Sequence, residues 1–485
     1  MAKSFTILSI LLLVGGLMPQ ANAFSLLGPY AIAGGNVWQV ERLGYNIDGD
    51  IGGPMNVAAG EEYRWNTKIV VYGYDAPFLD FFGTRGMQEV EKAVKIINDL
   101  PPASTLNVDD YPMTTERINF RAAALGLLDL KSSALAITLE EMGLASPNRW
   151  VYCLRNRGVP PSPVSPPPAY FNVIRRNFDP VTAAESPYIN GRLWTYIAIL
   201  DGTARSIVVN SPVDPLDIGR FDPVAVHLDT FFGGFLIGSY YSGLTRDDVG
   251  AIKYMFQPNN KNFEAAIPGS VGAGFVVGSG GGGGNNPPWG IPGTNVTTTN
   301  VTGGTITTNG LIDPVVRYGI DKITFVRGEF DSLLGQFFTP VPIAYSETIV
   351  TNNIVLSQSV QRLVTVPDIL YSAQDLQGIP DVSPLIPGVT FGAREVTARW
   401  QNDETLGGGT IEHAGPGVIQ PPIFISFNSI GFITFEGPIP GPVFGLNNLP
   451  YFLYGAFDGT TNEPVVFSQG GNITVQQLEQ LALGR

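Results

Sequence analysis

Residues 268–310 constrain the fold of this chain more than any other stretch. They read PGSVGAGFVVGSGGGGGNNPPWGIPGTNVTTTNVTGGTITTNG, with five consecutive glycines, Gly280 to Gly284, directly before NNPP. Glycine loses much conformational entropy when it is ordered, and proline lacks the backbone N–H that helices and sheets use. The composition therefore predicts a flexible linker, stiffened by prolines, that contains no helix and no regular strand.

This linker divides the chain into two predicted domains. A chain of 485 residues exceeds the size of one ordinary core, so more than one domain is expected. Residues 24–267 mix helical and strand patterns, which predicts an α+β domain. Residues 311–485 alternate strand-like runs with Gly, Pro and Asn, which predicts an all-β, sandwich-like domain. A short helix over 474–483 is expected to end it.

Local patterns give boundaries for the expected elements. In the first domain they predict a strand over 63–74, helices over 84–99, 114–130, 132–142 and 244–256, and strands over 170–178, 192–200 and 204–210. Asn190-Gly191 is a favoured two-residue hairpin turn. The strands expected after the linker are 315–327, 343–351, 354–366, 395–401, 422–427 and 431–435. A proline tract over 160–168 is expected to be a rigid connector or a ligand for a groove.

The first 23 residues have the features of a signal peptide. Lys3 supplies the positive start, residues 7–17 are apolar, and Ala21-Asn22-Ala23 has the small-residue pattern of a cleavage site. We therefore expect an exported mature chain that begins near Phe24 and lies outside the cell, at the cell surface or in the periplasm. No later stretch is long enough to span a membrane as a helix, so no transmembrane segment is expected after cleavage.

Charge and cysteine content exclude several classes of function. The formal net charge of −14 argues against nucleic acid or an anionic membrane as a partner. Cys153 is the single cysteine, so neither an intrachain disulfide nor a CxxC-type zinc site can form. Its apolar neighbours predict a structural thiol in a buried strand. An exported chain without disulfides, rich in Gly, Asn, Thr and Tyr, is typical of bacteria.

One stretch resembles a metal-binding loop. Asn46, Asp48 and Asp50 alternate around a glycine, as calcium ligands do. The EF-hand pattern requires a carboxylate at its twelfth position, which here is Val57, so a polar turn is the alternative interpretation. Calcium is the one cofactor that the sequence leaves open.

Most catalytic motifs are missing. The chain has only two histidines, His227 and His413, so neither a three-histidine site nor an HExxH zinc site can be built. It contains no GxSxG elbow and no GxxxxGK loop, and its one GxGxxG pattern lies in the glycine run, where no helix follows. Catalysis by two carboxylates stays open, because the 42 acidic residues offer many pairs.

The first domain resembles the matrixin-type metalloprotease domain in the order of four segments. These are the strand around Tyr63–Tyr74, the helix over Thr84–Asp99, the sequence LEEMGL at Leu139–Leu144 and the closing LTRDDVGAIKYMF at Leu244–Phe256. In that family the third segment carries HExxHxxGxxH and the fourth is the C-terminal helix.

This chain has other residue types where that family has its zinc-binding histidines. Its first two histidine positions would be Glu140 and Leu144, and only Glu141 and Gly143 match the motif. The resemblance therefore implies a protease-like scaffold that has lost its metal. More broadly, the chain looks like large secreted bacterial proteins.

These observations favour an exported, non-catalytic structural or adhesion protein with no recognisable catalytic residues. Its expected partner is a protein or carbohydrate surface, or a second copy of the chain, bound through a sheet edge or a loop face. The alternatives are an exported hydrolase that acts on peptides or polysaccharides through carboxylates, and a decayed metalloprotease-like scaffold.

Overall fold

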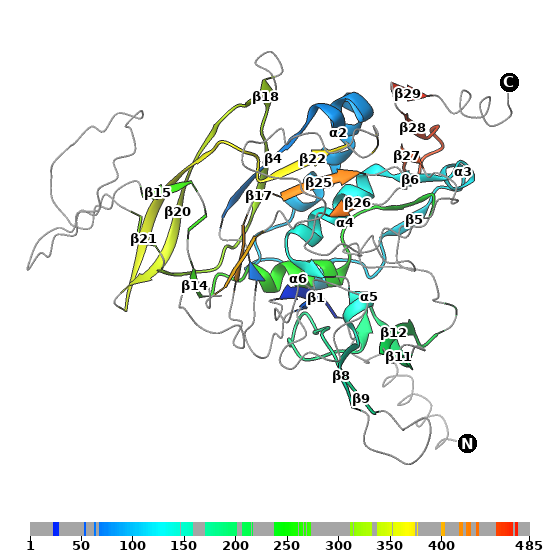
Figure 1. Cartoon of the computed structure of the whole chain (residues 1–485), viewed down its shortest axis with the longest axis horizontal. Helices are drawn as coiled ribbons and strands as arrows, with labels where there is room; N and C mark the ends of the chain where they lie inside the picture. Colours follow the sequence, from blue (N-terminus) through cyan, green and yellow to red (C-terminus); the bar gives the residue numbers. More distant parts are fainter. Residues whose placement is uncertain are drawn as a thin grey trace, which may run out of the picture.

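The structure is a computed structural model. It describes residues 23–28, 53–54, 63–64, 67–145, 147–158, 170–200, 206–214, 216, 237–259, 261–264, 266–267, 269–272, 311–313, 315–331, 337–351, 353–373, 376, 399–402, 417–420, 423–427, 433–435, 453–468 and 471–473. Within them the chain is a mixed α/β protein with few helices and many strands in several sheets (Figure 1).

The described helices are short except for one. They are α2 (Ala76–Asn98), α3 (Phe120–Ala124), α4 (Leu130–Glu141), α5 (Pro147–Trp150), α6 (Arg246–Met255) and the 3₁₀ helix η2 (Val108–Asp110). None of these described helices combines the length and the apolarity that crossing a membrane requires.

A five-stranded central sheet organises the fold. Its order is β17 (Thr324–Arg327), β4 (Ile69–Tyr74), β22 (Ile369–Ser372), β25 (Ile423–Phe427) and β26 (Ile433–Phe435). The first four strands are parallel, and β26 is antiparallel to β25.

Strands from both sides of the glycine-rich stretch 268–310 pair in this sheet. β4 precedes the stretch, and both of its neighbours, β17 and β22, follow it. The short β3 (Tyr63–Arg64) and β6 (Leu127–Asp129) likewise pair with β24 (Gly417–Gln420) and β27 (Leu453–Ala456). The boundary predicted between residues 24–267 and 311–485 is therefore not a boundary between sheets.

A five-stranded outer sheet is antiparallel throughout. Its order is β14 (Asn262–Glu264), β16 (Val315–Arg317), β20 (Val341–Thr351), β21 (Ile354–Val364) and β15 (Ser270–Gly272). β15 falls inside the predicted linker, so the prediction that residues 268–310 hold no strand is wrong at their start. Val271 pairs with Gln361 because the long edge of β21 supplies a partner for an otherwise weak strand. Val71 of β4 packs with Ile343 and Val364, which joins the outer sheet to the central one.

The remaining strands form small sheets around these two. They are β1 (Ser25–Gly28) between β2 (Gly53–Pro54) and β7 (Leu144–Ala145); β10 (Tyr188–Ile189), β11 (Arg192–Leu200) and β12 (Ser206–Pro212); β13 (Ser239–Tyr241) with β5 (Glu116–Ile118); and β8 (Cys153–Gly158) with β9 (Tyr170–Ile174). The others are β18 (Phe330–Asp331) with β19 (Phe337–Phe338); β23 (Arg399–Asn402) with β24 and β3; and β27 with β6, β28 (Val465–Ser468) and β29 (Gly471–Ile473).

Helix α2 covers the central sheet and begins earlier than predicted. The sequence placed its start at Thr84, but the side chain of Asp75 accepts a hydrogen bond from the Phe78 N–H at 2.8 Å and caps the helix there. Gly83 has φ +60° and kinks the helix directly before the predicted start. The aromatic run that precedes Thr84 is helical because Phe78, Phe81 and Phe82 are buried in the core.

The predicted helix over 114–130 is wrong. That stretch holds β5, the short helix α3 and β6 in succession. Backbone pairing overrides the helical pattern, since Glu116–Ile118 pairs with β13 and Leu127–Asp129 with β27.

Helices α4 and α6 confirm their predicted caps. Gly143 follows α4 with φ +111°, the left-handed conformation expected of a glycine after a helix. In α6 the Thr245 and Asp248 side chains each accept the other's backbone N–H, so the predicted capping box is present. Asn190 and Gly191 both have positive φ between β10 and β11, as a two-residue hairpin requires.

An aromatic cluster fills the space between α2 and the central sheet. The Phe82 ring lies 5.5 Å from Phe427, 5.7 Å from Tyr454 and 5.3 Å from Phe467, all edge to face. Phe82 precedes the stretch 268–310 and its three partners follow it, so one core unites the two halves of the sequence.

Several predicted features lie outside the described residues. They are the signal peptide up to residue 22, most of the linker, the proline tract over 160–168 and the C-terminal helix over 474–483.

Candidate functional site

The predicted site residues are largely outside the described part of the chain. This holds for Asn46, Asp48 and Asp50 of the candidate calcium loop and for His227 and His413. Among the residues that the structure does describe, no group of three or more His, Cys, Asp or Glu side chains is placed to hold a metal ion. Cys153 opens strand β8, which confirms the strand predicted around it.

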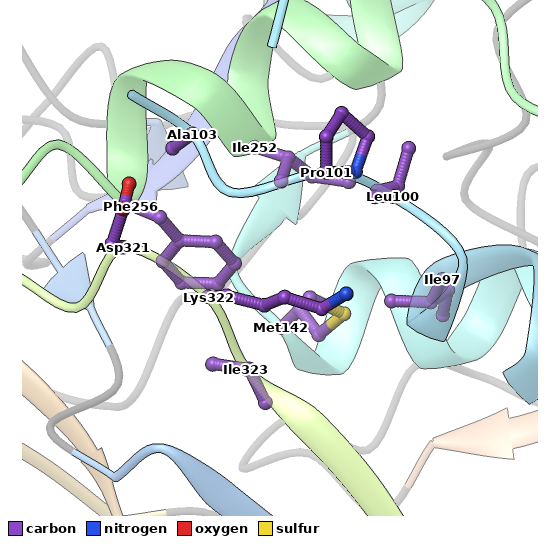
Figure 2. A pocket seen from close by; sticks show the side chains of 10 residues that line it. All are labelled: Ile97, Leu100, Pro101, Ala103, Met142, Ile252, Phe256, Asp321, Lys322 and Ile323. Carbon is purple, nitrogen blue, oxygen red and sulfur yellow. The ribbon is translucent and has the colours of Figure 1, made fainter. Parts of the chain in front are cut away.

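A small pocket lies where both halves of the sequence meet (Figure 2). It has a volume of about 20 Å³, room for about one water molecule. Its lining is mostly apolar, and the two charged residues, Asp321 and Lys322, come from the turn before β17. Asp321 accepts hydrogen bonds from the backbone N–H and the hydroxyl of Ser104, at 2.7 and 2.8 Å. The pocket is therefore too small for a substrate.

Two buried carboxylates serve the fold. Asp129 accepts hydrogen bonds from the backbone N–H of Ser132 at 3.0 Å and from its hydroxyl, and so caps α4. Burial raises the pKa of Asp129 to about 6, against the lowering by Lys131 and Ser132. Asp368 accepts both a bidentate pair from Arg362 and the backbone N–H of Val71. Each carboxylate therefore stabilises the elements next to it.

An exposed apolar surface lies on β11 and β12. In this antiparallel pair Ile197 stands opposite Val209, and the Val213 N–H donates to the Leu193 carbonyl at 2.9 Å. Leu193, Ile197, Val209 and Val213 therefore share one side of the ribbon, and they are 40%, 62%, 40% and 51% exposed. We call these four side chains the ribbon face.

The opposite side of the ribbon fixes it to the protein. Trp194 is buried, and the Tyr196 ring, although 39% exposed, lies 4.7 Å from the Tyr152 ring. The Asn210 side-chain amide donates hydrogen bonds to the Asn148 carbonyl at 3.2 Å and to the Tyr152 carbonyl at 3.1 Å. Since one side is held in this way, the ribbon face points outward. In Figure 1, β11 and β12 lie near β8 and away from the central sheet.

Known proteins offer no guide to this surface. Comparison with known proteins found no matching family model, no similar curated protein and no similar solved structure. The resemblance to matrixin-type domains therefore stays a prediction, carried by the order of the four segments.

The ribbon face was not predicted, although its strands were. Residues 193, 195 and 197 alternate with 194 and 196, and this period of two predicts a two-faced strand. Both sides carry large apolar side chains, namely Leu193 and Ile197 on one and Trp194 and Tyr196 on the other. The pattern therefore could not show which side the rest of the protein covers.

Proposed function

We propose that this chain is an exported, non-catalytic protein that works at the cell surface or outside the cell as a structural or adhesion module. The ribbon face is the observation that carries the proposal. Apolar side chains grouped on one exposed face mark contact surfaces more often than isolated exposed residues do. Its four side chains together expose roughly two complete aliphatic side chains, so covering them would contribute about 3–6 kcal/mol.

The chemistry of the ribbon face favours a protein as the partner. The four side chains of the ribbon face are aliphatic, and the Thr195 and Ser211 hydroxyls that stand opposite each other between them are the polar groups on this side of the ribbon, so most of the surface to be covered offers no hydrogen bond to a sugar hydroxyl, whose burial without a partner is costly. A complementary apolar protein surface pays no such penalty. A second copy of the chain is the first partner to test, because two ribbon faces can cover each other in a symmetric contact.

Export and the sandwich-like arrangement belong to the same proposal. The Lys3-led apolar segment and Ala21-Asn22-Ala23 support export. Packing of Ile343 and Val364 of the outer sheet against Val71 of β4 in the central sheet supports a sandwich-like arrangement.

Sedimentation velocity of the mature protein over a range of concentrations tests the proposal. We expect self-association, and we expect the double variant Ile197→Ser/Val209→Ser to weaken it at least about 100-fold, from a loss of about 3 kcal/mol. The matched control is Ile354→Ser/Val355→Ser, two residues of the β20–β21 hairpin that are 58% and 56% exposed. Equal effects of the two double variants would refute a role for the ribbon face.

An activity screen separates this proposal from the hydrolase alternative. The mature protein is incubated with casein and with common polysaccharides, and released products are measured. The proposal predicts no turnover above buffer. Turnover that a single Asp or Glu substitution abolishes would overturn it.

A further inference from the structure

The segment that spans the predicted cleavage site is buried from its first described residue. Ala23, Phe24, Ser25 and Leu26 expose at most 1% of their surface. β1 lies beside α6 in Figure 1. The first residues of a chain are usually poorly ordered unless something holds them, so specific contacts must hold this segment in the fold.

Phe24 is held by both its backbone and its ring. Its N–H donates to the Phe178 carbonyl at 2.8 Å, and its carbonyl accepts the Phe178 N–H at 2.8 Å. Its ring lies 5.4 Å from Tyr254 of α6. The next residue continues the anchoring, since the Ser25 hydroxyl donates to the Arg176 carbonyl at 2.9 Å.

A buried carboxylate lies at the start of this segment. Asp247, in the first turn of α6, is completely buried. One of its oxygens accepts the Ala23 N–H at 3.2 Å and the other accepts the Asn190 N–H at 2.6 Å. Both donors are neutral amides, and burial holds the pKa of Asp247 well above its ordinary value.

The charged groups near Asp247 do little to offset the rise in its pKa that burial causes. Asp248, on the same helix, has the same sign and raises its pKa further. Arg246 lowers the pKa, but its guanidinium is paired with Asp109. From the other elements packed around it, Asn190 and Ala23 supply only backbone N–H groups.

We propose that Asp247 is the internal partner of the mature N-terminus. Removal of the leader takes the Ala23 N–H away from Asp247 and converts the Phe24 amide, the next along the chain, into an α-ammonium that pairs with the Asp247 carboxylate. The inference rests on the proposed export of the chain.

The chemistry of the step balances with water alone. A signal peptidase hydrolyses the bond between the Ala23 carbonyl and the Phe24 nitrogen. Water adds across that bond: its oxygen joins the Ala23 carbonyl carbon, which leaves with the leader as a carboxylate, and its two hydrogens go to the Phe24 nitrogen, which becomes an ammonium. One negative charge departs with the leader, and one positive charge is created inside the fold.

The geometry brings the new charge to Asp247. Successive backbone nitrogens are about 3–4 Å apart, and the Ala23 nitrogen is 3.2 Å from Asp247 Oδ1. The Phe24 ammonium therefore forms within roughly 7 Å of the carboxylate. The departure of Ala23 leaves space between them, and the Phe24 nitrogen, which donates to the Phe178 carbonyl at 2.8 Å before cleavage, moves into that space to reach the carboxylate. Cleavage one residue earlier would place an ammonium on Asp247 directly.

The pKa of the α-amine tests the inference. The secreted protein is labelled with limiting acetic anhydride from pH 6 to pH 11, and the N-terminal peptide is quantified by mass spectrometry. Pairing with Asp247 raises the amine pKa from about 7.7–8.0 to above about 9, and labelling at pH 7 falls at least about 10-fold relative to the same protein unfolded in urea. Burial without pairing would lower that pKa instead, so the sign of the shift separates pairing from burial.

Variants assign the effect to the carboxylate. Asp247→Asn should return the amine pKa to about 8 or below, and Asp129→Asn, at another buried helix cap, should leave it raised. If Asp247→Asn does not fold, the comparison of folded and urea-unfolded wild type still decides. An ordinary or lowered pKa in the folded wild type would overturn the inference.

The mass of the secreted protein distinguishes the two proposals. A chain that begins near Phe24 supports export, and the amine titration then decides the role of Asp247 alone. A chain that keeps its leader, or that stays inside the cell, would overturn export and the inference together.

Discussion

The buried pair between Arg362 and Asp368 should be among the most sensitive contacts in the described structure. Arg362 lies on β21 of the outer sheet, and its guanidinium donates to both Asp368 oxygens, at 3.0 and 2.5 Å. Asp368 precedes β22 of the central sheet and also accepts the Val71 N–H at 2.8 Å. The side chains are only 6% and 1% exposed. The contact therefore joins the two large sheets.

Replacing Arg362 leaves a buried, uncompensated carboxylate. Arg362→Met keeps much of the side-chain volume and removes the charge, which should lower the free energy of unfolding by about 3–5 kcal/mol at neutral pH. Removing both charges with Arg362→Met/Asp368→Asn should recover roughly 2 kcal/mol or more of that loss, because the neutral amide oxygen still accepts the Val71 N–H.

The loss should depend on pH with a defined sign. Burial raises the pKa of Asp368 and Arg362 opposes that rise, so the variant has a still higher pKa in the folded state. Below the unfolded value of about 3.9 the carboxyl is protonated in both states and the charge penalty is absent. The penalty grows as the pH rises through the folded pKa.

Urea unfolding followed by tryptophan fluorescence at pH 4.5 and pH 7.5 measures both effects. The account predicts a larger difference between wild type and Arg362→Met at pH 7.5. A loss under about 1 kcal/mol at pH 7.5, or an equal loss at both pH values, would refute the reasoning.

Three further predictions concern Asp129, Gly83 and the predicted cleavage site. Burial raises the pKa of Asp129 to about 6. Protonated Asp129 therefore stabilises the fold at a pH below its unfolded pKa, and this contribution is lost as the pH rises through about 6. Asp129→Asn should flatten the pH dependence of the thermal midpoint in this window. Gly83→Ala should lower the free energy of unfolding by about 1–3 kcal/mol, because alanine resists φ +60° with ψ −165°. An unchanged urea midpoint would contradict the kinked conformation at Gly83. Folded precursor should resist added signal peptidase at least about 100-fold better than urea-unfolded precursor, because Ala23 and Phe24 are buried; equal rates in a gel assay would contradict this.

The sequence predicted elements whose signals are local. The capping box at Thr245 and Asp248, the glycine after α4 and the Asn190-Gly191 turn each depend on residues within one turn of backbone, and the structure has all of them. The start of α2 also had a local signal that the prediction missed. Asp75 is followed two positions later by Pro77, a typical order for a cap and a first helical turn.

Long-range pairing explains most of what the sequence could not predict. The glycine run suggested two separate domains, yet β4 pairs with β17 and β22, each more than 200 positions away along the chain. No local pattern encodes which parallel strands become neighbours. The helical pattern over 114–130 failed for the same reason, since β13 and β27 pair with its two ends.

The candidate surface depends on the same long-range packing. Strand patterns over 192–200 and 204–210 predicted the hairpin, but Tyr152 and Asn148 decide which of its sides is covered. Neither residue belongs to the hairpin. Only the structure could therefore place Ile197 and Val209 on the exposed side.

Retention at the cell surface tests the central claim most directly. The producing cells secrete wild type, Ile197→Ser/Val209→Ser or the control Ile354→Ser/Val355→Ser, and the bound fraction is measured against the fraction free in the medium at equal total secretion. A contact worth about 3 kcal/mol predicts that the ribbon-face variant loses about 100-fold in the ratio of bound to free protein. The control should match wild type. Equal retention of all three proteins would contradict the claim that this chain works through the ribbon face.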